Sequence, residues 1–336
     1  MLWKCAVAFV AITCCVRAQE QALREAARLD AEGKCGEAER YYQQALAAGR
    51  PSPSLLNNLG NHYLLCGQPA KAEAYFEQLL KLNPSHPNAN LQLARLATER
   101  KQGAKALEYL GRVKDADPAV RLLRAEALHW AGKRAAAGAL LETLEKEAGS
   151  DSRLLFALGL TCARIGAYDR AEAAFHRVLL QHPADFSVLF NLGRAAARAE
   201  NYDRAERALE AALKIRPDDA DSLLELGLVH AARRDFNRAV YLLAQARQRA
   251  PKRTDILLAL ARATEDAGYY GDSALAYDEY LALRPDDHKA RRDRARVYGY
   301  TGTRLDEGLR EMAWYIAKYP NDPAGHFNLA QFTWRD

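Results

Sequence analysis

Apolar residues between Ser152 and Asp185 recur at the three- to four-residue spacing of a helix, in two separate stripes. When this stretch is numbered from 1 at Ser152, the first stripe occupies positions 4, 7, 8 and 11, and the second occupies positions 20, 24 and 27. The residues at these positions are Leu155, Leu158, Gly159, Cys162, Ala171, Phe175 and Val178. Gly166 at position 15 and Pro183 at position 32 interrupt the pattern. The stretch is therefore predicted to form two amphipathic helices, and neither can bury its stripe without a neighbour.

The same pattern returns in the next two stretches of equal length, which supply that neighbour. Positions 4, 7, 8, 20, 24 and 32 hold Leu189, Leu192, Gly193, Ala205, Leu209 and Pro217 in the next stretch, and Leu223, Leu226, Gly227, Ala239, Leu243 and Pro251 in the one after it. Glycine or alanine at positions 8 and 20 removes the side chains where paired helices would cross, and large residues at position 24 fill the space beside them. Proline at position 32 cannot continue a helix, so it separates one helix pair from the next.

A period of about 34 residues with Leu-Gly in the first helix, Ala in the second and Pro at the close resembles the tetratricopeptide repeat (TPR) family. The resemblance extends over residues 19–336 and implies an all-α fold, a right-handed superhelical solenoid of antiparallel helix pairs. About nine repeats and a C-terminal partial helix are expected, at residues 19–52, 53–86, 87–117, 118–151, 152–185, 186–219, 220–253, 254–287, 288–322 and 323–336.

Three of these repeats and the partial one depart from the pattern. The third repeat is shortened by three residues. Arginines replace the leucines of positions 4 and 7 in the fourth repeat and again in the ninth, where they are Arg291 and Arg294. The partial repeat contains Phe327, Phe332 and Trp334. These rings either fold back on the ninth repeat or face a partner.

The first eighteen residues have the pattern of a secretory signal peptide. Lys4 precedes an apolar run from Cys5 to Val16, and Val16 and Ala18 are small residues suited to cleavage after Ala18. The run of 12 residues is short for a membrane span of ~20 residues, although an uncleaved segment that anchors the protein to a membrane stays as the alternative. We therefore expect an extracytoplasmic protein, periplasmic or secreted. Removal of Lys4 and Arg17 lowers the formal charge from +5 to +3, which is too weak to predict nucleic-acid binding.

Motifs for catalysis, cofactor binding or metal binding are missing from the sequence. The eight histidines are spread along the chain and are interpreted as capping or surface residues. The acidic pairs at 218–219 and 286–287 each follow a proline and precede a predicted helix, which is typical of N-caps rather than of a general acid–base pair. The sequence therefore predicts a protein that is not an enzyme and that binds no cofactor, metal or nucleic acid.

Three cysteines follow the predicted signal peptide, an odd number that argues against a fold built on disulfides. Cys162 lies on an apolar stripe and is predicted to be a small buried residue. Cys35 and Cys66 fall near the turns of adjacent repeats. They either bridge in an oxidising compartment or lie too far apart to form a disulfide.

The resemblance also implies where a ligand would bind. In TPR arrays the first helices line a concave groove, which positions 5 and 9 commonly face. In this sequence, apolar side chains at position 5 are expected to form a row beside the guanidinium groups at position 9. The candidate peptide-binding residues are Phe156, Phe190, Leu224, Leu258, Arg95, Arg194, Arg262 and Arg296. Such a surface suits a peptide with hydrophobic anchors and acidic or C-terminal carboxylates. The alternative is that position 5 packs against the adjacent repeat and that the arginines are only solvated.

The function predicted first is an exported, non-enzymatic scaffold or adaptor that binds protein or peptide segments. It would serve the assembly of an envelope or secretion complex, in peripheral association with a membrane-bound complex. A second function is an adaptor that binds an anionic glycan or a membrane surface through its arginine-bearing face. A third is an enzyme whose site lies in the irregular repeats, and no residue pattern supports it.

Overall fold

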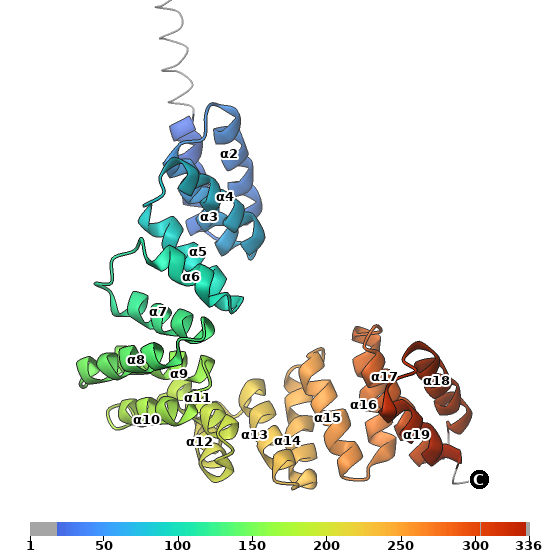
Figure 1. Ribbon diagram of the computed structural model, residues 1–336. Coiled ribbons are helices and arrows are strands. Elements are labelled where there is room, and N and C mark those ends of the chain that lie inside the picture. Colours follow the sequence, from blue (N-terminus) through green and yellow to red (C-terminus); the bar gives the residue numbers. More distant parts are fainter. Residues whose placement is uncertain (1–18, 303, 334–336) are drawn as a thin grey trace, which may run out of the picture. The chain divides into compact units, whose positions relative to one another are not determined.

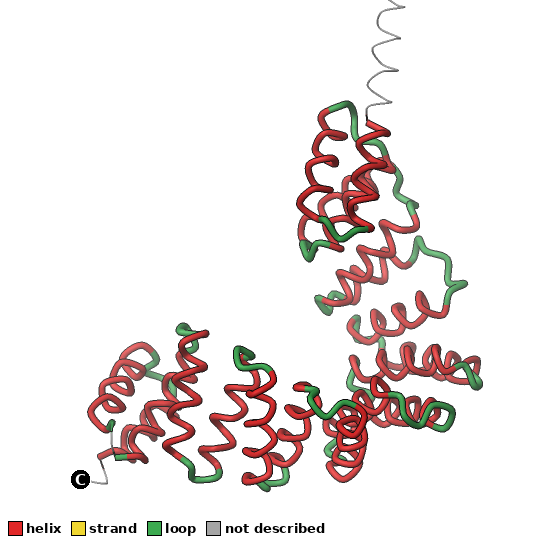
Figure 2. Tube along the Cα trace, turned by 180° about the vertical axis from the view of Figure 1, so that it is seen from behind, coloured by secondary structure: helices red, strands yellow, loops and turns green. Residues whose placement is uncertain are grey.

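The computed structural model describes residues 19–302 and 304–333, and these residues form helices joined by short loops, without strands (Figures 1 and 2). This confirms the all-α fold predicted from the repeat pattern. The predicted signal peptide lies outside the described residues, as does Trp334. Within the described part, no helix is long and apolar enough to cross a membrane. The chain divides after Gly149 into two compact units, which are considered separately.

The described part of the first unit begins with a helix over residues 19–31. The helices that follow are α2 (Cys35–Ala47), α3 (Pro53–Leu65), α4 (Pro69–Leu82), α5 (Pro87–Glu99), α6 (Gly103–Leu110), α7 (Pro118–Trp130) and α8 (Arg134–Ala148). From α2 onward each helix packs against the next. One cluster of buried apolar side chains extends from the first helix to α7, and its largest members include Tyr42, Tyr63 and Phe76.

The second unit continues the same arrangement from residue 150 onward. Its helices are α9 (Ser152–Arg164), α10 (Tyr168–Leu179), α11 (Phe186–Arg198), α12 (Tyr202–Ile215), α13 (Ala220–Ala232), α14 (Phe236–Arg249), α15 (Thr254–Asp266), α16 (Tyr270–Leu283), α17 (His288–Thr301), α18 (Leu305–Lys318) and α19 (Pro323–Thr333). Each helix again packs against the next, and the first helices α9, α11, α13 and α15 also contact one another in turn. Each unit is therefore a stack of helix pairs whose core runs along the stack.

Position 8 of the repeat lies where the two helices of a pair approach closely. A Cβ atom added to Gly193 in α11 would lie 2.6 Å from Cγ of Leu209, the position-24 residue of α12. A Cβ atom on Gly159 would likewise lie 2.6 Å from the ring of Phe175. Both distances are shorter than real Cβ contacts. The prediction that glycine at position 8 makes room for the helix crossing is confirmed.

The turn between paired helices has a left-handed backbone at position 15 throughout. Glycine takes this position in most repeats, namely at Gly33, Gly67, Gly132, Gly166, Gly268 and Gly302. Lys101, Glu200 and Arg234 adopt the same conformation, with φ values of 58°, 60° and 63°. The residue after Gly166 donates its N–H to the carbonyl oxygen five residues earlier, at 2.9 Å, and so closes the first helix with a Schellman-type bond. The turn is therefore a property of the repeat, whether or not glycine is present.

Aspartate side chains cap several first helices. Asp219 accepts a hydrogen bond from the amide of Ser222 at 2.8 Å, and Asp287 accepts one from the amide of Ala290 at 3.0 Å. Burial alone would raise the pKa of Asp287, but hydrogen bonds from backbone amides and from Tyr280 lower it below its usual value. The second residue of each acidic pair, Asp219 or Asp287, is therefore an N-cap, as predicted.

Candidate peptide-binding surface

The predicted binding residues lie on the first helices of their repeats, at equivalent places in successive helix pairs. Arg95 lies on α5 in the first unit and is exposed. The other seven lie in the second unit, on α9, α11, α13, α15 and α17. Because α9, α11, α13 and α15 contact one another in turn, residues at one repeat position form a row across this unit.

The apolar members of this row differ in how much surface they offer. Phe156, Phe190 and Leu258 are half-buried. The ring centroid of Phe156 lies 5.7 Å from that of the buried Phe175, so part of it belongs to the core. Leu224 is only 7% exposed and packs within the core, so it offers little surface to a ligand.

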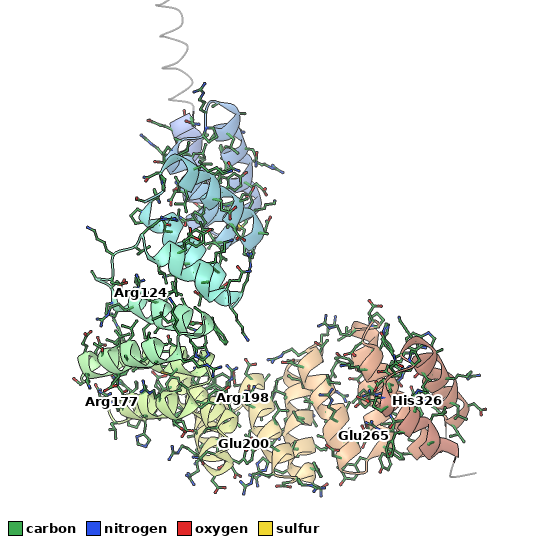
Figure 3. The ribbon with its side chains drawn as sticks, viewed as in Figure 1. Arg124, Arg177, Arg198, Glu200, Glu265 and His326 are labelled. Carbon is green, nitrogen blue, oxygen red and sulfur yellow. A yellow bond between two sulfur atoms is a disulfide. The ribbon has the colours of Figure 1, made fainter. Side chains whose placement is uncertain are left out.

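The arginines of the row differ in their partners. Arg194 is exposed, and its Nε lies 3.1 Å from Oε1 of Glu225 on α13. Arg296 is half-buried between α17 and α15, where Nε and Nη2 donate to Glu265 at 2.7 and 2.9 Å. Glu265, the acceptor of both hydrogen bonds, lies on α15 (Figure 3). Arg262 is exposed on α15. The structure therefore leaves Arg194 and Arg262 accessible but holds Arg296 in an ion pair between repeats.

Aromatic rings and guanidinium groups stack along α11. The rings of Phe186 and Phe190 are nearly parallel, with an interplanar angle of 5° and centroids 6.1 Å apart. The guanidinium carbon of Arg194 lies 5.5 Å from the ring centroid of Phe190, and that of Arg216 lies 4.0 Å from that of Phe186. These are cation–π distances, so Phe190 and Arg194 hold each other in place on the surface.

A hollow of about 310 Å³ lies between α9 and α11, on the face that carries Arg194. It is lined by Leu160, Ala163, Arg164, Tyr168, Asn191, Arg194, Ala195 and Arg198. Three of these residues are exposed arginines, and Arg198, labelled in Figure 3, is the last residue of α11. The hollow combines apolar walls with positive charge, which is the combination expected for an apolar segment that carries a carboxylate.

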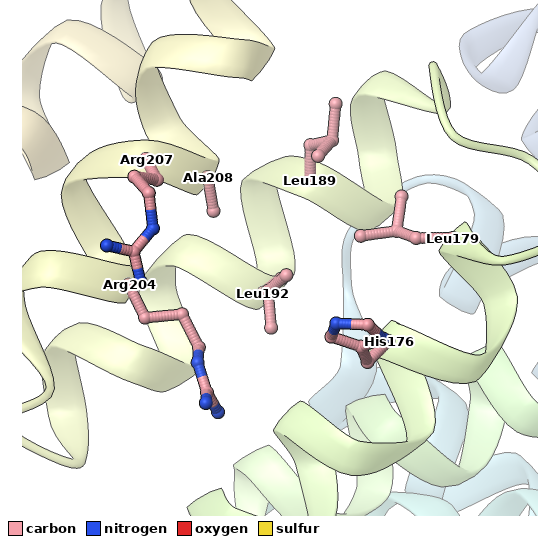
Figure 4. A pocket seen from close by; sticks show the side chains of 7 residues that line it. All are labelled: His176, Leu179, Leu189, Leu192, Arg204, Arg207 and Ala208. Carbon is pink, nitrogen blue, oxygen red and sulfur yellow. The ribbon is translucent and has the colours of Figure 1, made fainter.

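A second hollow, of about 350 Å³, is lined by residues of α10, α11 and α12 (Figure 4). Leu189 and Leu192 of α11 lie between His176 and Leu179 of α10 and the side chains of α12. The residues from α12 are Arg204, Arg207 and Ala208. Arg204 also forms an ion pair with the buried carboxylate of Glu172, so part of its charge is already neutralised.

Sequence reasoning missed several residues that shape the first hollow. Tyr168 is the first residue of the second helix, and Asn191 occupies position 6, outside the positions associated with the TPR groove. Glu225, also at position 6, pairs with Arg194 across the gap between adjacent first helices. The sequence shows Glu225 31 residues after Arg194, and this spacing of about one repeat is the signal that could have indicated the ion pair.

The cysteines of the first unit settle a question that the sequence left open. Cys35 and Cys66 form a disulfide, with their Cα atoms 5.9 Å apart. Cys162 is buried, as predicted.

The interpretation of every histidine as a capping or surface residue is wrong for His62 and His230, which are 1% and 3% exposed. His62 lies against Asp30 of the preceding repeat, and His230 lies 3.2 Å from Asp235, the N-cap residue of α14.

Sequence profiles of the tetratricopeptide repeat family match the chain over residues 64–119 and, in overlapping segments, over residues 122–187, 163–220 and 190–254. Together these segments cover more than half of the chain. The chain therefore belongs to the tetratricopeptide repeat family, as its repeat pattern predicted.

One solved structure has the same fold, and others resemble part of the chain. A tetratricopeptide repeat protein from Parabacteroides merdae matches with a TM-score of 0.54 and 15% identity, over 82% of this chain and 96% of its own. A structure of MamA from AMB-1 matches with a TM-score of 0.47 and 24% identity, over 51% of this chain and 93% of its own. No curated protein sequence matches the chain significantly.

Proposed function

We propose that this chain is a non-enzymatic scaffold that binds protein or peptide segments across the exposed face of α9 and α11. The observation that carries the proposal is the hollow between these helices, which joins apolar walls to the exposed Arg164, Arg194 and Arg198. Tetratricopeptide repeat proteins are generally protein-binding scaffolds without catalytic activity, which supports this class of function.

The chemistry of the hollow favours a segment with one apolar anchor and one carboxylate. The anchor would displace water from Leu160 and Ala163, and the carboxylate would accept charge-assisted hydrogen bonds from a guanidinium group. Arg198 lies 4.0 Å from Glu225, whereas Arg194 lies 3.1 Å from it. Arg198 is therefore the more available donor for a ligand.

Export and a role in assembling an envelope or secretion complex are part of the same proposal. They rest on the signal-peptide pattern of residues 1–18. The Cys35–Cys66 disulfide supports an oxidising compartment, because disulfides persist outside the reducing cytosol.

A polyanionic ligand, whether a glycan or a membrane surface, is the less favoured alternative. Many arginines of the second unit already face carboxylates, including Arg253 between Asp221 and Asp255. These pairs reduce the net positive field that a polyanion needs. Binding to such a ligand would also weaken steeply with salt, whereas binding of an apolar peptide would change much less.

The proposal is tested with short fluorescent peptides that end in leucine or phenylalanine and carry either a free C-terminal carboxylate or an amide. Fluorescence anisotropy should detect tighter binding of the carboxylate form. Changing Arg198→Gln should weaken it about tenfold, the effect of losing one charge-assisted hydrogen bond of ~1.5 kcal/mol. Changing Leu160→Ala should weaken both forms.

The matched control is Arg207→Gln, which removes an exposed arginine from the other hollow. It should leave binding unchanged. If Arg207→Gln abolishes binding and Arg198→Gln does not, the peptide site lies on α10 and α12 instead. If no peptide of either form binds the wild type in low or high salt, the proposal is rejected.

A further inference from the structure

Four side chains of residue types that bind metal ions meet at the disulfide of the first unit, and two of them form it. His62 lies in the last turn of α3, and its Nδ1 lies 3.7 Å from Sγ of Cys66, the residue that caps the C-terminus of this helix. The same Nδ1 lies 2.6 Å from Oδ1 of Asp30, on the helix over residues 19–31. The ligand atoms of these three residues all lie within 4.8 Å of one another. Cys35, bonded to Cys66, brings a second sulfur to the cluster.

Aromatic rings and a tyrosine hydroxyl surround this cluster and hold its polar side chains in place. His62 is 1% exposed, and its ring lies 5.0 Å from those of both Tyr42 and Tyr63. The hydroxyl of Tyr42 donates to Oδ2 of Asp30 at 2.7 Å, which fixes the orientation of the carboxylate. Outer hydrogen bonds of this kind are the usual support of metal-ligating carboxylates. A disulfide by itself needs neither an imidazole nor a carboxylate beside it.

We propose that reduction of the Cys35–Cys66 disulfide turns this cluster into a four-ligand Zn²⁺ site. The ligands are Cys35 Sγ, Cys66 Sγ, His62 Nδ1 and Asp30 Oδ1. Zn²⁺ prefers four tetrahedral ligands drawn from thiolates, imidazoles and carboxylates. The proposal is independent of peptide binding, because all four ligands lie in the first unit and the proposed peptide surface lies in the second.

One ligand distance already fits a tetrahedral zinc site, and the others require adjustments of up to about 2 Å. Zinc–sulfur and zinc–nitrogen bonds of about 2.3 and 2.0 Å place tetrahedral sulfur and nitrogen ligands about 3.5 Å apart. Cys66 Sγ and His62 Nδ1 are already 3.7 Å apart. Zinc would replace the hydrogen bond between His62 and Asp30, and these two ligands would separate by less than about 1 Å to reach a tetrahedral spacing. The two sulfur atoms would move apart once their bond is broken.

The redox step balances with a dithiol as the reductant. The dithiol delivers two electrons and two protons and becomes a disulfide, while the Cys35–Cys66 bond breaks and yields two thiols. Both cysteines are half-buried, so a small reductant can reach the bond. Zn²⁺ then replaces the two thiol protons, and the proton on His62 moves from Nδ1 to Nε2. Metal binding therefore releases two protons per chain at a pH where the thiols are protonated.

The test uses the full chain with Cys5, Cys14 and Cys15 changed to serine, which leaves Cys35, Cys66 and Cys162 as its cysteines. Oxidised protein and protein reduced with a phosphine, which becomes the phosphine oxide by taking oxygen from water, are each dialysed against Zn²⁺. Elemental analysis should find one zinc per reduced chain and none per oxidised chain. Co²⁺ in place of zinc should give the absorption bands of a tetrahedral thiolate site.

Matched variants separate this site from adventitious thiol binding. His62→Gln and Cys66→Ser should each weaken zinc binding by about 100-fold or more, and Asp30→Asn by about tenfold. Cys162→Ser is the control and should bind zinc as the parent does. The proposal is overturned if reduced and oxidised chains bind equally, if His62→Gln binds like the parent, or if Cys162→Ser loses the zinc.

Circular dichroism covers the case in which reduction loosens the first unit. Zinc should then restore the lost helical signal and raise the melting temperature of the reduced parent, but not of His62→Gln. If reduction lowers the helical signal and zinc does not restore it, the proposal is overturned.

Discussion

At the scale of the residue, glycine is required at position 8 because the paired helices pack closely there, and not because the backbone must be flexible. Gly193 and Gly227 face the position-24 leucines of their partner helices, with a missing Cβ that would lie 2.6 and 2.8 Å from the leucine Cγ. Gly271 in α16 has no atom within 4 Å of its missing Cβ. Replacing Gly193 and replacing Gly271 should therefore change the free energy of unfolding in opposite directions.

Changing Gly193→Ala should lower the free energy of unfolding by about 1–3 kcal/mol, because the added methyl group forces Leu209 out of its packed position. Changing Gly271→Ala should be neutral or stabilising by up to about 1 kcal/mol, since alanine favours the helix and meets no neighbour. Urea unfolding followed by circular dichroism compares the two. Equal effects from both variants would contradict the assignment of position 8 to the helix crossing.

At the scale of the element, the ninth repeat replaces an apolar stripe by ion pairs. Arg294 Nη1 lies 2.6 Å from Asp278 on α16, and Arg291 Nε lies 3.1 Å from Glu311 on α18. Arg294 also donates to Glu311, whose side chain is 9% exposed. The hydroxyl of Tyr298 donates to Asp278 at 2.7 Å. Long charged side chains thus join α16, α17 and α18 where other repeats use leucine.

Changing Arg294→Leu should cost about 3 kcal/mol, because it removes a partner from the buried carboxylate of Glu311. Adding Glu311→Leu should recover most of this loss, since an apolar pair of similar size needs no desolvation of charge. Buried Nε of Arg294 and Oε2 of Glu311 have no hydrogen-bond partner, which favours this recovery. Thermal unfolding of both single variants and the double variant gives the coupling energy. Additive losses would contradict the pairing.

The same elements give a dependence of stability on pH. Burial alone would raise the pKa of Asp278, but hydrogen bonds from Tyr298, Arg294 and Arg304 lower it below its usual value. A carboxyl whose folded pKa is lowered stabilises the fold fully above its unfolded pKa, and the stabilisation is lost as the pH falls through the folded pKa. The melting temperature should therefore fall between about pH 5 and pH 3. In Asp278→Asn it should be lower at pH 5 and should change less with pH; an unchanged pH slope would exclude this role of Asp278.

At the scale of the whole molecule, each unit is a stack in which a helix pair contacts mainly its neighbours. In such a stack the effect of a local change fades over a few repeats. The disulfide joins the second helix of the first repeat to the end of α3 and encloses a separation of 31 residues. Its stabilisation should therefore be confined to the start of the first unit.

Changing both Cys35→Ser and Cys66→Ser should destabilise this end by about 3–4 kcal/mol, the value for closing a loop of this length. Hydrogen exchange measured by mass spectrometry should become faster in residues 19–65 and stay unchanged in α13–α16. Cys162→Ser is the control and should leave exchange in residues 19–65 unchanged. Faster exchange throughout the chain in the double variant would show that its stability is not local.

The sequence by itself determined the helices, their pairing and the positions that form the core. These features depend on residues within one repeat, and the chain displays that repeat many times. The glycines alone predict only some of the left-handed turns, since Lys101, Glu200 and Arg234 adopt the same backbone conformation. The tight helix pair on either side fixes the turn there and overrides local preference.

Only the tertiary structure decided which polar side chains pair and which stay available to a ligand. Cys35 meets Cys66, Asp30 meets His62 and Glu265 meets Arg296 at separations of 31 or 32 residues. These separations are shorter than the repeat because the contacts cross between stacked helices at different positions along each. A local pattern cannot show which of several facing side chains will meet. The pairing follows from how the repeats stack, and it therefore determines that Arg296 is held while Arg198 stays exposed.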